Sequence, residues 1–354
     1  MAGAMVGVRL ARGRHRHAPL QPPPSPGAEL VTVLVPARNE EHRIGPCLAG
    51  IAEDPAVAEL IVIDDCSTDA TAEVARAHGA RVLTGREPAA GWVGKSWALQ
   101  QGLEAASHDL VVCLDADTRP KPGLVAALAE VLREADFITA GPCFDCATTG
   151  ERLLHPSMLA SLVYRFGPGD SRDHKPRVAR LVANGQCMAF RRRALLDAGG
   201  FRHAAGYFTD DAALARALAH NGWRVAFRDG RELLEVRMHS SAPELWREWG
   251  RTISFADVTK PAPLTADCVL VALTMGLPVM RLIRLRPSRL DLVLLAVRWL
   301  LLAGLRQSYS RRGVAFWLSP LADPLTTVRL LSSSLRQPLS WRGRGYAALG
   351  KPVE

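Results

Sequence analysis

The sequence predicts an α/β fold in which helices flank a mostly parallel sheet, followed by a C-terminal hydrophobic helical region that associates with a membrane. Short apolar runs rich in β-branched residues, at 30–36, 60–63 and 110–114, alternate with amphipathic segments of helical length. This alternation is typical of parallel sheets whose strands end at one edge. The third observation is the apolar character of the chain after residue 257.

The elements follow from local signals along the chain. The segment 42–52 is amphipathic and predicts a helix, and Ser67 or Asp69 can cap the next one. A glycine-bounded loop precedes Lys95. Further helices are expected at 70–78, 96–106, 123–133 and 153–166, and further strands at 81–83, 137–143, 182–190, 223–227 and 233–238.

The central predicted strand, residues 110–114, is followed by two carboxylates, Asp115 and Asp117. Ligands of open α/β sheets bind at the carboxyl ends of the strands. Two carboxylates at such an end can share one divalent cation that also holds phosphate oxygens. Taken alone, the same pattern fits a solvated turn before Pro120 equally well.

The ends of the neighbouring strands favour the metal and phosphate interpretation. They bring several charged side chains to the same edge, namely Arg38, Glu40, Asp64, Asp65, Asp115 and Asp117. Carboxylates this close repel one another, and a divalent cation or the donors of a nucleotide would relieve the repulsion. The sequence therefore predicts a nucleotide and its metal at this edge.

Four motifs occur in order here: Val-Pro-Ala-Arg-Asn-Glu-Glu at 35–41, Ile-Asp-Asp-Cys-Ser-Thr-Asp at 63–69, Gly-Lys at 94–95 and Asp-Ala-Asp at 115–117. Each is weak alone, but their shared order makes chance agreement improbable. Together they resemble the signatures of family 2 glycosyltransferases with the GT-A fold. The resemblance implies inverting transfer from a nucleotide-sugar donor, usually a UDP-sugar, assisted by Mg²⁺ or Mn²⁺.

The resemblance assigns expected roles to the nucleoside side of the site. Pro36, Arg38 and Glu40 would line the nucleoside pocket, and Asp64 or Asp65 would contact the uracil. The family usually has a glycine after this aspartate pair. Its replacement by cysteine at position 66 is expected to alter the turn without removing a ligand.

The diphosphate side follows in the same way. Lys95 would be a donor-side cation, Asp115 would lie near the ribose or the metal, and Asp117 would ligate the cation that bridges the diphosphate. Residues 248–252 are the closest match to the family's Gln-x-x-Arg-Trp, and Arg251 would neutralise the leaving diphosphate. The departures from that motif argue against processive polymer synthesis. A single histidine, His239, is either a further metal ligand or structural.

The segment 207–214 resembles the acidic motif that starts a helix in this family, which implies that Asp211 is the catalytic base and Asp210 supports it. Inverting transfer requires a carboxylate that removes the acceptor proton, and a helix N-terminus favours the ionised form. Without the resemblance, the same residues would be an ordinary helix cap. Asn184 and Gln186 bind a sugar or satisfy backbone groups, and the polar loop 167–180 closes over the site or is a plain connection.

The division expected along the chain is a disordered basic, proline-rich tail at 1–28, a GT-A catalytic domain at 29–256, a membrane-associated helical region at 257–335 and a C-terminal tail at 336–354. The seven cysteines are odd in number and irregularly spaced, which indicates reduced thiols in a cytosolic environment. The pair Cys143 and Cys146 is expected to be buried small residues rather than half a zinc site.

Three C-terminal segments, at 269–280, 290–305 and 314–331, are strongly apolar, but each is too short for a clean membrane span or is interrupted by charge or proline. Interfacial or re-entrant helices are therefore at least as well supported as full spans, and a soluble core is the alternative. Asp291 and Arg298 are seven residues apart and are expected to pair inside this bundle.

The C-terminal region, together with Trp341-Arg-Gly-Arg-Gly-Tyr346 and Gly91-Trp-Val-Gly-Lys95, resembles the hopanoid-associated and carotenoid-type enzymes of the family. This implies a lipid or terpenoid acceptor at the cell membrane, with the catalytic domain facing the cytoplasm. The formal charge of +9 comes without a nucleic-acid-binding signature, which favours phosphates and lipid headgroups over nucleic acid. A sugar-phosphate nucleotidyltransferase and a non-catalytic membrane scaffold are the alternatives. The oligomeric state is not predicted.

Overall fold

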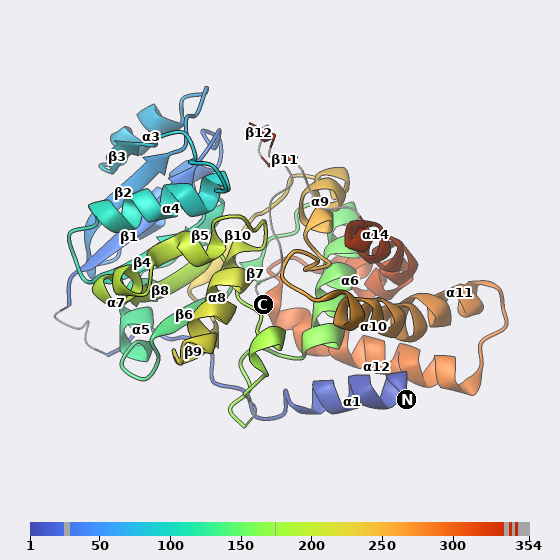
Figure 1. The fold of residues 1–354 in the computed structure, drawn as a ribbon. Coiled ribbons are helices and arrows are strands. Elements are labelled where there is room, and N and C mark those ends of the chain that lie inside the picture. Colours follow the sequence, from blue (N-terminus) through green and yellow to red (C-terminus); the bar gives the residue numbers. More distant parts are fainter. Residues whose placement is uncertain (25–28, 174, 336–339, 342–343, 346–354) are drawn as a thin grey trace.

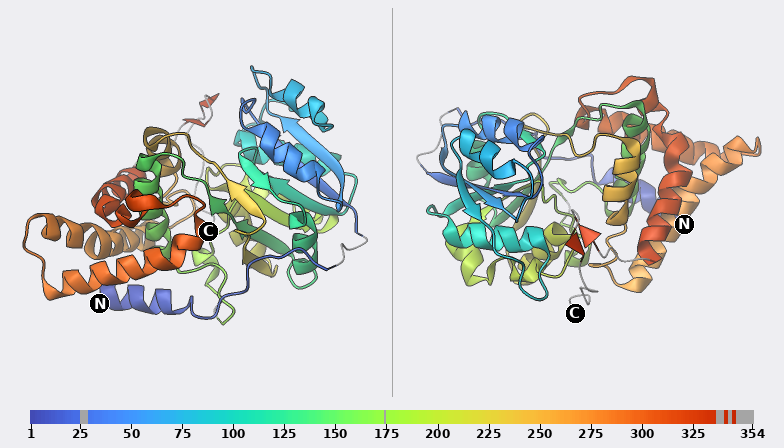
Figure 2. Two further views of the ribbon diagram at one scale, coloured as in Figure 1. Left: turned by 180° about the vertical axis from the view of Figure 1, so that it is seen from behind. Right: turned by 90° about the horizontal axis from the view of Figure 1, so that it is seen from above.

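The computed structural model describes residues 1–24, 29–173, 175–335, 340–341 and 344–345. An α/β part built on a seven-stranded sheet lies beside a helical part (Figures 1 and 2). The strands of the sheet are β1 (Val31–Ala37), β2 (Val57–Asp64), β3 (Arg81–Thr84), β4 (Leu110–Leu114), β6 (Phe137–Gly141), β8 (Cys187–Arg191) and β9 (Val225–Asp229).

The strand order is β3-β2-β1-β4-β8-β6-β9. All neighbours run parallel except β8, which is antiparallel to both β4 and β6. The predicted mostly parallel α/β sheet is therefore confirmed. Because β1 and β4 are paired and parallel, the residues that follow them meet at one edge.

Helices cover both faces of the sheet because its strands are apolar on both sides. Along β1, Val33 and Val35 pack into one buried cluster while Leu34 packs into the other. The helices that contribute to the first cluster are α2 (Ile44–Ala52), α3 (Thr71–Ala77) and α5 (Leu124–Val131). Those of the second are α4 (Gly94–Ala105), α7 (Arg192–Asp197), η2 (Gly200–Ala204) and α8 (Asp210–His220).

A small second sheet continues from the carboxyl end of β4. Its strands are β5 (Thr118–Pro120), β10 (Leu234–Val236) and β7 (Cys143–Phe144), in the order β5-β10-β7. The amide of Arg237 donates a hydrogen bond to the carbonyl of Asp117 (3.2 Å). This pairing holds the chain just after the acidic pair.

The helical part is assembled from distant segments. Helix α6 (Thr149–Phe166), which begins with a capping box between Thr148 and Glu151, packs with the C-terminal helices around one buried cluster. The helical elements after it are η1 (Val178–Arg180), α9 (Ala242–Glu248), η3 (Trp249–Arg251), α10 (Pro261–Val271), η4 (Ala272–Gly276), α11 (Leu277–Ile283), α12 (Arg289–Leu305), η5 (Arg306–Ser308), α13 (Gly313–Trp317), η6 (Ser319–Ala322) and α14 (Asp323–Leu335). The short strands β11 (Ser340–Trp341) and β12 (Arg344–Gly345) follow, and the rest of the expected tail at 336–354 lies outside the described residues.

The N-terminal segment differs from the expected disordered tail. Residues Ala2–Ala11 form helix α1, whose Val6 is buried in the cluster around α6. Leu20 is buried in the core of the α/β part, and its amide donates to the carbonyl of Asp229 (2.8 Å). The arginine, histidine and proline content of residues 1–28 favours disorder, but the first residues form a helix because their apolar side chains pack against α6 and α12.

The expected pair between Asp291 and Arg298 is wrong. Arg298 is buried and pairs with Asp323 at 3.0 Å, which joins α12 to α14. Asp291 completes a capping box with Ser288 at the start of α12 and lies 3.5 Å from Arg281. Because the Asp291 carboxylate caps the helix, it is not the partner of Arg298 that the sequence spacing suggests.

Among the described residues, one continuous helix, Pro261–Ile283, has the length and apolar composition needed to cross a membrane, and half of its apolar window is buried inside the protein. Many exposed large apolar side chains lie on the helical part, including Ile283, Leu285 and Leu300.

Candidate active site

A cavity of about 1000 Å³ lies where the carboxyl ends of β1 and β4 face the helical part. One end of the cavity is lined by polar residues of the α/β part, including Lys95, Asp117 and Asp211. The other end is apolar and is lined from α6 and α12, for example by Leu159 and Leu301. The two ends belong to one continuous space.

Asp211 and Lys95 are joined through the backbone of Gly185. The amide of Gly185 donates a hydrogen bond to Asp211 Oδ2 (2.8 Å), and Lys95 Nζ donates to the Gly185 carbonyl (3.3 Å). A Cβ at position 185 would lie 3.1 Å from Lys95 Nζ and 3.2 Å from Asp211 Cβ, so only glycine fits without a shift. Lys95 Nζ also lies 2.7 Å from Asp115.

Lys95 and the surrounding aspartates shift one another's pKa values. Burial alone would lower the pKa of Lys95, but Asp115, Asp210 and Asp211 outweigh it and raise the pKa, so the ammonium stays charged. Burial raises the pKa of Asp210 to about 7 and raises that of Asp211, while Lys95 acts in the opposite direction on both. Both carboxylates therefore hold a proton more readily than ordinary aspartates, as suits groups that accept one from a hydroxyl.

Asp210 and Asp211 begin helix α8, as the sequence predicts. Thr209 precedes them without capping the helix through its side chain. Its hydroxyl instead donates to Asp257 Oδ1, and the amides of Phe208 and Thr209 both donate to Asp257 Oδ2 (2.9 Å each). Asp257, which sequence reasoning missed, therefore fixes the turn that presents the acidic pair.

Asp115 and Asp117 both line the cavity. Among the described residues, no group of three or more His, Cys, Asp or Glu side chains is arranged to hold a metal by itself. Two carboxylates beside an open cavity nevertheless fit a small divalent cation, because Mg²⁺ is commonly bound by one or two carboxylates and takes its other oxygens from phosphates and water. His239, at 7% exposure, lines the same cavity.

The nucleoside-side residues lie at the carboxyl ends of β1 and β2. Pro36, Arg38 and Glu40 line the cavity, and Glu40 pairs with Arg43 at 2.9 Å. Asp64 and Asp65 are buried beside this loop and lie outside the cavity lining. The Arg38 guanidinium donates to the carbonyl of Asp65 (2.5 Å), which links the two strand ends.

Cys66 has a φ of 55°, so the turn keeps the left-handed conformation that glycine would favour, and the expected change in the turn is wrong. Arg251 ends η3, but its side chain lies outside the described part of the structure.

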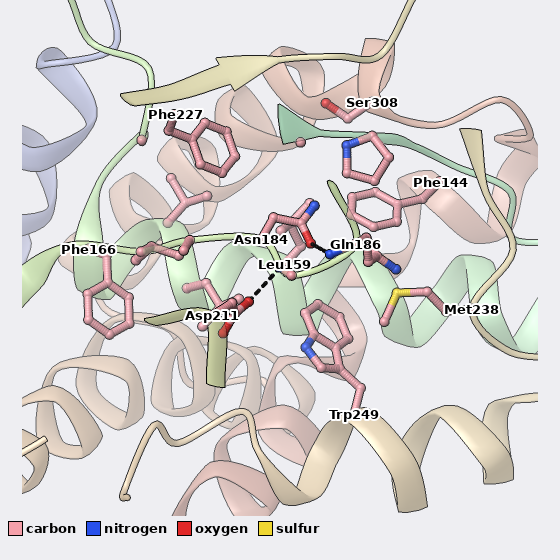
Figure 3. A pocket seen from close by; sticks show the side chains of 18 of the residues that line it. Phe144, Leu159, Phe166, Asn184, Gln186, Asp211, Phe227, Met238, Trp249 and Ser308 are labelled. Carbon is pink, nitrogen blue, oxygen red and sulfur yellow. Dashed lines mark hydrogen bonds between the residues drawn. The ribbon is translucent and has the colours of Figure 1, made fainter. Parts of the chain in front are cut away.

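Of the two roles expected for Asn184, binding a sugar or satisfying backbone groups, the structure shows the second. Its Nδ2 donates to the carbonyl of Ala140 (3.0 Å), and its Oδ1 accepts from the amide of Gln186 (3.2 Å; Figure 3). Trp249 from η3 is a further lining residue without a distinct sequence signal, and it points into the cavity near Met238 (Figure 3).

The fold and the site together define an α/β protein with an acidic cavity at the carboxyl edge of its sheet, and the family follows from comparison. Residues 26–253 match the family model described as "Glycosyltransferase like family 2". Because the match covers more than half of the chain, the chain belongs to this family, whose GT-A fold the mostly parallel sheet resembles.

Curated relatives match over a shorter stretch. The 4,4'-diaponeurosporenoate glycosyltransferases of Staphylococcus aureus strains bovine RF122 / ET3-1 and USA300 are 44% and 43% identical over 88 residues, which are 25% of this chain and 24% of each relative. The match thus spans about a quarter of these relatives. Among solved structures, the mannosyltransferase PcManGT from Pyrobaculum calidifontis, in complex with GDP-Man and Mn²⁺, covers 94% of this chain and 95% of its own with a TM-score of 0.55 and 18% identity, which supports the fold.

Proposed function

We propose that this protein is an inverting glycosyltransferase that moves a sugar, most simply a hexose from a UDP-sugar, to a lipid or terpenoid acceptor at the cell membrane. The observation that carries the proposal is the single cavity, which joins the carboxylates and Lys95 to apolar walls. A donor with a charged diphosphate requires the polar end, and an apolar acceptor requires the other. The division into a catalytic domain at 29–256 and a membrane-associated region at 257–335 belongs to the same proposal.

In this mechanism Asp211 removes the acceptor proton while the acceptor oxygen forms a bond to the anomeric carbon and the bond to the diphosphate breaks. The Gly185 amide orients the Asp211 carboxylate, and Asp210 supports it. Lys95 and Arg251 would balance the negative charge that develops on the diphosphate. Asp117 and Asp115 would hold a Mg²⁺ or Mn²⁺, which neutralises diphosphate charge when bound.

The nucleoside would lie against Pro36, Arg38 and Glu40, with Asp64 and Asp65 supporting the turn beneath Arg38. The names of the staphylococcal relatives support a carotenoid-type acceptor. Because sugar nucleotides are cytosolic, the catalytic domain would face the cytoplasm. The exposed apolar side chains of the helical part support its contact with lipid.

The test combines nucleotide binding with transfer. UDP is titrated calorimetrically with and without Mn²⁺, against ADP and GDP, and transfer from UDP-sugars to lipid acceptors is then measured. Asp211→Asn should keep metal-dependent UDP binding and lose about 10²- to 10⁴-fold in transfer rate, since it removes the base. Asp117→Ala should lose both.

Normal transfer by Asp211→Asn would overturn the base assignment. Turnover of a sugar phosphate with a nucleoside triphosphate would point to a nucleotidyltransferase. Absence of any nucleotide binding by the folded protein would favour a non-catalytic scaffold.

A further inference from the structure

The apolar end of the cavity opens between helices α1 and α12. The cavity is lined there by Gly7 and Ala11 of α1 and by Leu300 and Gly304 of α12, and all four are exposed to solvent. Leu300 is 71% exposed although it lines the cavity. Residues that are both cavity lining and exposed mark an opening at the surface. The two helices lie side by side, since a Cβ on Gly3 would meet Leu294 of α12 at 3.2 Å (Figures 1 and 2).

Each of the two helices has a glycine at this opening. A Cβ added at Gly7 or at Gly304 would meet no atom within 4 Å, and neither backbone is in the left-handed region. Glycine within a helix is less favourable than alanine by roughly 0.5–1 kcal/mol. Neither glycine is therefore required by local backbone geometry or by close packing, and what the two positions share is open space at the mouth of the cavity.

Exposed apolar side chains lie along both helices that border the opening. Met5 and Val8 of α1 are 48% and 60% exposed, and Leu292 and Val293 of α12 are 52% and 58% exposed. Exposed apolar side chains gathered on neighbouring helices are typical of a surface that contacts lipid or a partner. Arg14, which follows α1, also lines the cavity and is exposed, so its charged side chain can reach water or headgroups.

We propose that the opening between α1 and α12 is a lateral portal through which the apolar chain of the acceptor enters from the lipid leaflet, with Gly7 and Gly304 setting its width. The inference rests on the proposed function, because it deepens the assignment of the acceptor. The cavity, at about 1000 Å³, is at the upper end of the roughly 300–1000 Å³ of small-molecule pockets. It must also hold the donor, so a long chain fits only if part of it remains outside, in lipid.

The test uses a brominated fatty acid, 9,10-dibromostearic acid, as the probe. Bromine quenches tryptophan fluorescence only at contact, and Trp249 lines the cavity near Met238. Subtracting the signal of Trp249→Phe isolates Trp249 from the other tryptophans. In the double variant Gly7→Leu/Gly304→Leu, the concentration of brominated fatty acid that quenches half of the Trp249 fluorescence should rise at least ten-fold. The matched control, Ala4→Leu/Ala296→Leu, adds the same bulk at exposed positions of the same helices outside the cavity and should behave as wild type.

UDP titration of each variant serves as the test of folding, because the nucleoside end is distant from both substitutions. Unchanged quenching of Trp249 in a glycine variant that still binds UDP would overturn the portal and leave the proposed transfer intact. Loss of quenching in the glycine variant, in a protein that transfers no sugar to any lipid, would support the portal and overturn the proposed function. Equal loss in the control variant would also overturn the portal, because it would place the probe on the outer surface.

Discussion

Asp257 illustrates how a single carboxylate positions the acidic start of a helix. It accepts two amide hydrogen bonds and one hydroxyl hydrogen bond from Phe208 and Thr209, immediately before Asp210. Hydrogen bonds to a charged acceptor contribute about 1.5–3 kcal/mol each, more than neutral ones. The turn is therefore held rigidly although it lies on the surface of a cavity.

We expect Asp257→Ala to lower kcat by about 10- to 100-fold while the KM for the donor changes little, because a misplaced base loses rate without losing donor contacts. Steady-state kinetics with a lipid acceptor measure both constants. Asp257→Asn, which keeps an acceptor oxygen, should rescue part of kcat, and the exposed Asp197→Ala is the control. A lower melting temperature with an unchanged kcat would show that Asp257 is only structural.

The sequence identifies those cavity residues that lie at the end of a predicted strand or at the start of a predicted helix. The cavity is lined by Lys95 at the start of α4, by Asp115 and Asp117 after β4 and by Asp211 at the start of α8, because these ends meet at one edge of the sheet. The roles of Gly185 and Asp257 cannot be predicted in this way. The partner of Gly185 is 26 residues away in the chain, and the partners of Asp257 are 48 and 49 residues away. Contacts of this kind depend on the completed fold.

Helices α6, α12 and α14 are joined by a buried charged pair. Asp323 of α14 accepts from Arg298 of α12 and from the hydroxyl of Ser157 of α6 (2.7 Å). Arg298 is 1% exposed, so its charge has no access to bulk water. The pair thus fixes the relative position of three helices.

We expect Asp323→Ala to destabilise the protein by about 3–5 kcal/mol, because it leaves the Arg298 charge buried without its partner. Denaturant unfolding followed by far-UV circular dichroism measures the change. The double variant Arg298→Leu/Asp323→Leu removes both charges and should be distinctly more stable than Asp323→Ala. If the single variant matched wild type, the pair would be irrelevant to stability.

The prediction of elements succeeds where the signal is local and fails where it depends on partners. The strands of the sheet are apolar runs of the right length, and their alternation with helices is visible in the sequence. Helix α1 is different, because ten residues are too few to be stable alone and the helix depends on packing against α6. The sequence marks Asp291 and Arg298 as charged residues in an apolar segment without indicating which partners they have.

The whole molecule presents charge and apolar surface together at one end. Leu285, in the turn between α11 and α12, is 88% exposed, and Leu290, in the first turn of α12, is 62% exposed. The same stretch carries Arg284, Arg286 and Arg289. Apolar side chains flanked by arginines suit the boundary between acyl chains and anionic headgroups. The α/β part lies at the opposite side of the molecule (Figure 1).

We expect Arg284→Gln/Arg286→Gln/Arg289→Gln to bind vesicles containing anionic phospholipid about 100-fold more weakly, at roughly 1 kcal/mol for each arginine near the surface. Vesicle flotation at low and high salt measures the binding, and salt should narrow the difference. The control, Arg76→Gln/Arg133→Gln/Arg224→Gln, removes three exposed charges from the α/β part and should bind as wild type. Equal weakening by both variants would mean that only net charge matters.

The shared cavity also has a consequence for how the donor is protected. Water that enters an empty apolar branch has a continuous path to the polar end, where the anomeric carbon of a bound donor would lie. In the proposed transfer, an acceptor chain that filled this branch would close the path to water, so the acceptor itself would protect the donor from hydrolysis. Such an arrangement would protect the donor without a separate lid.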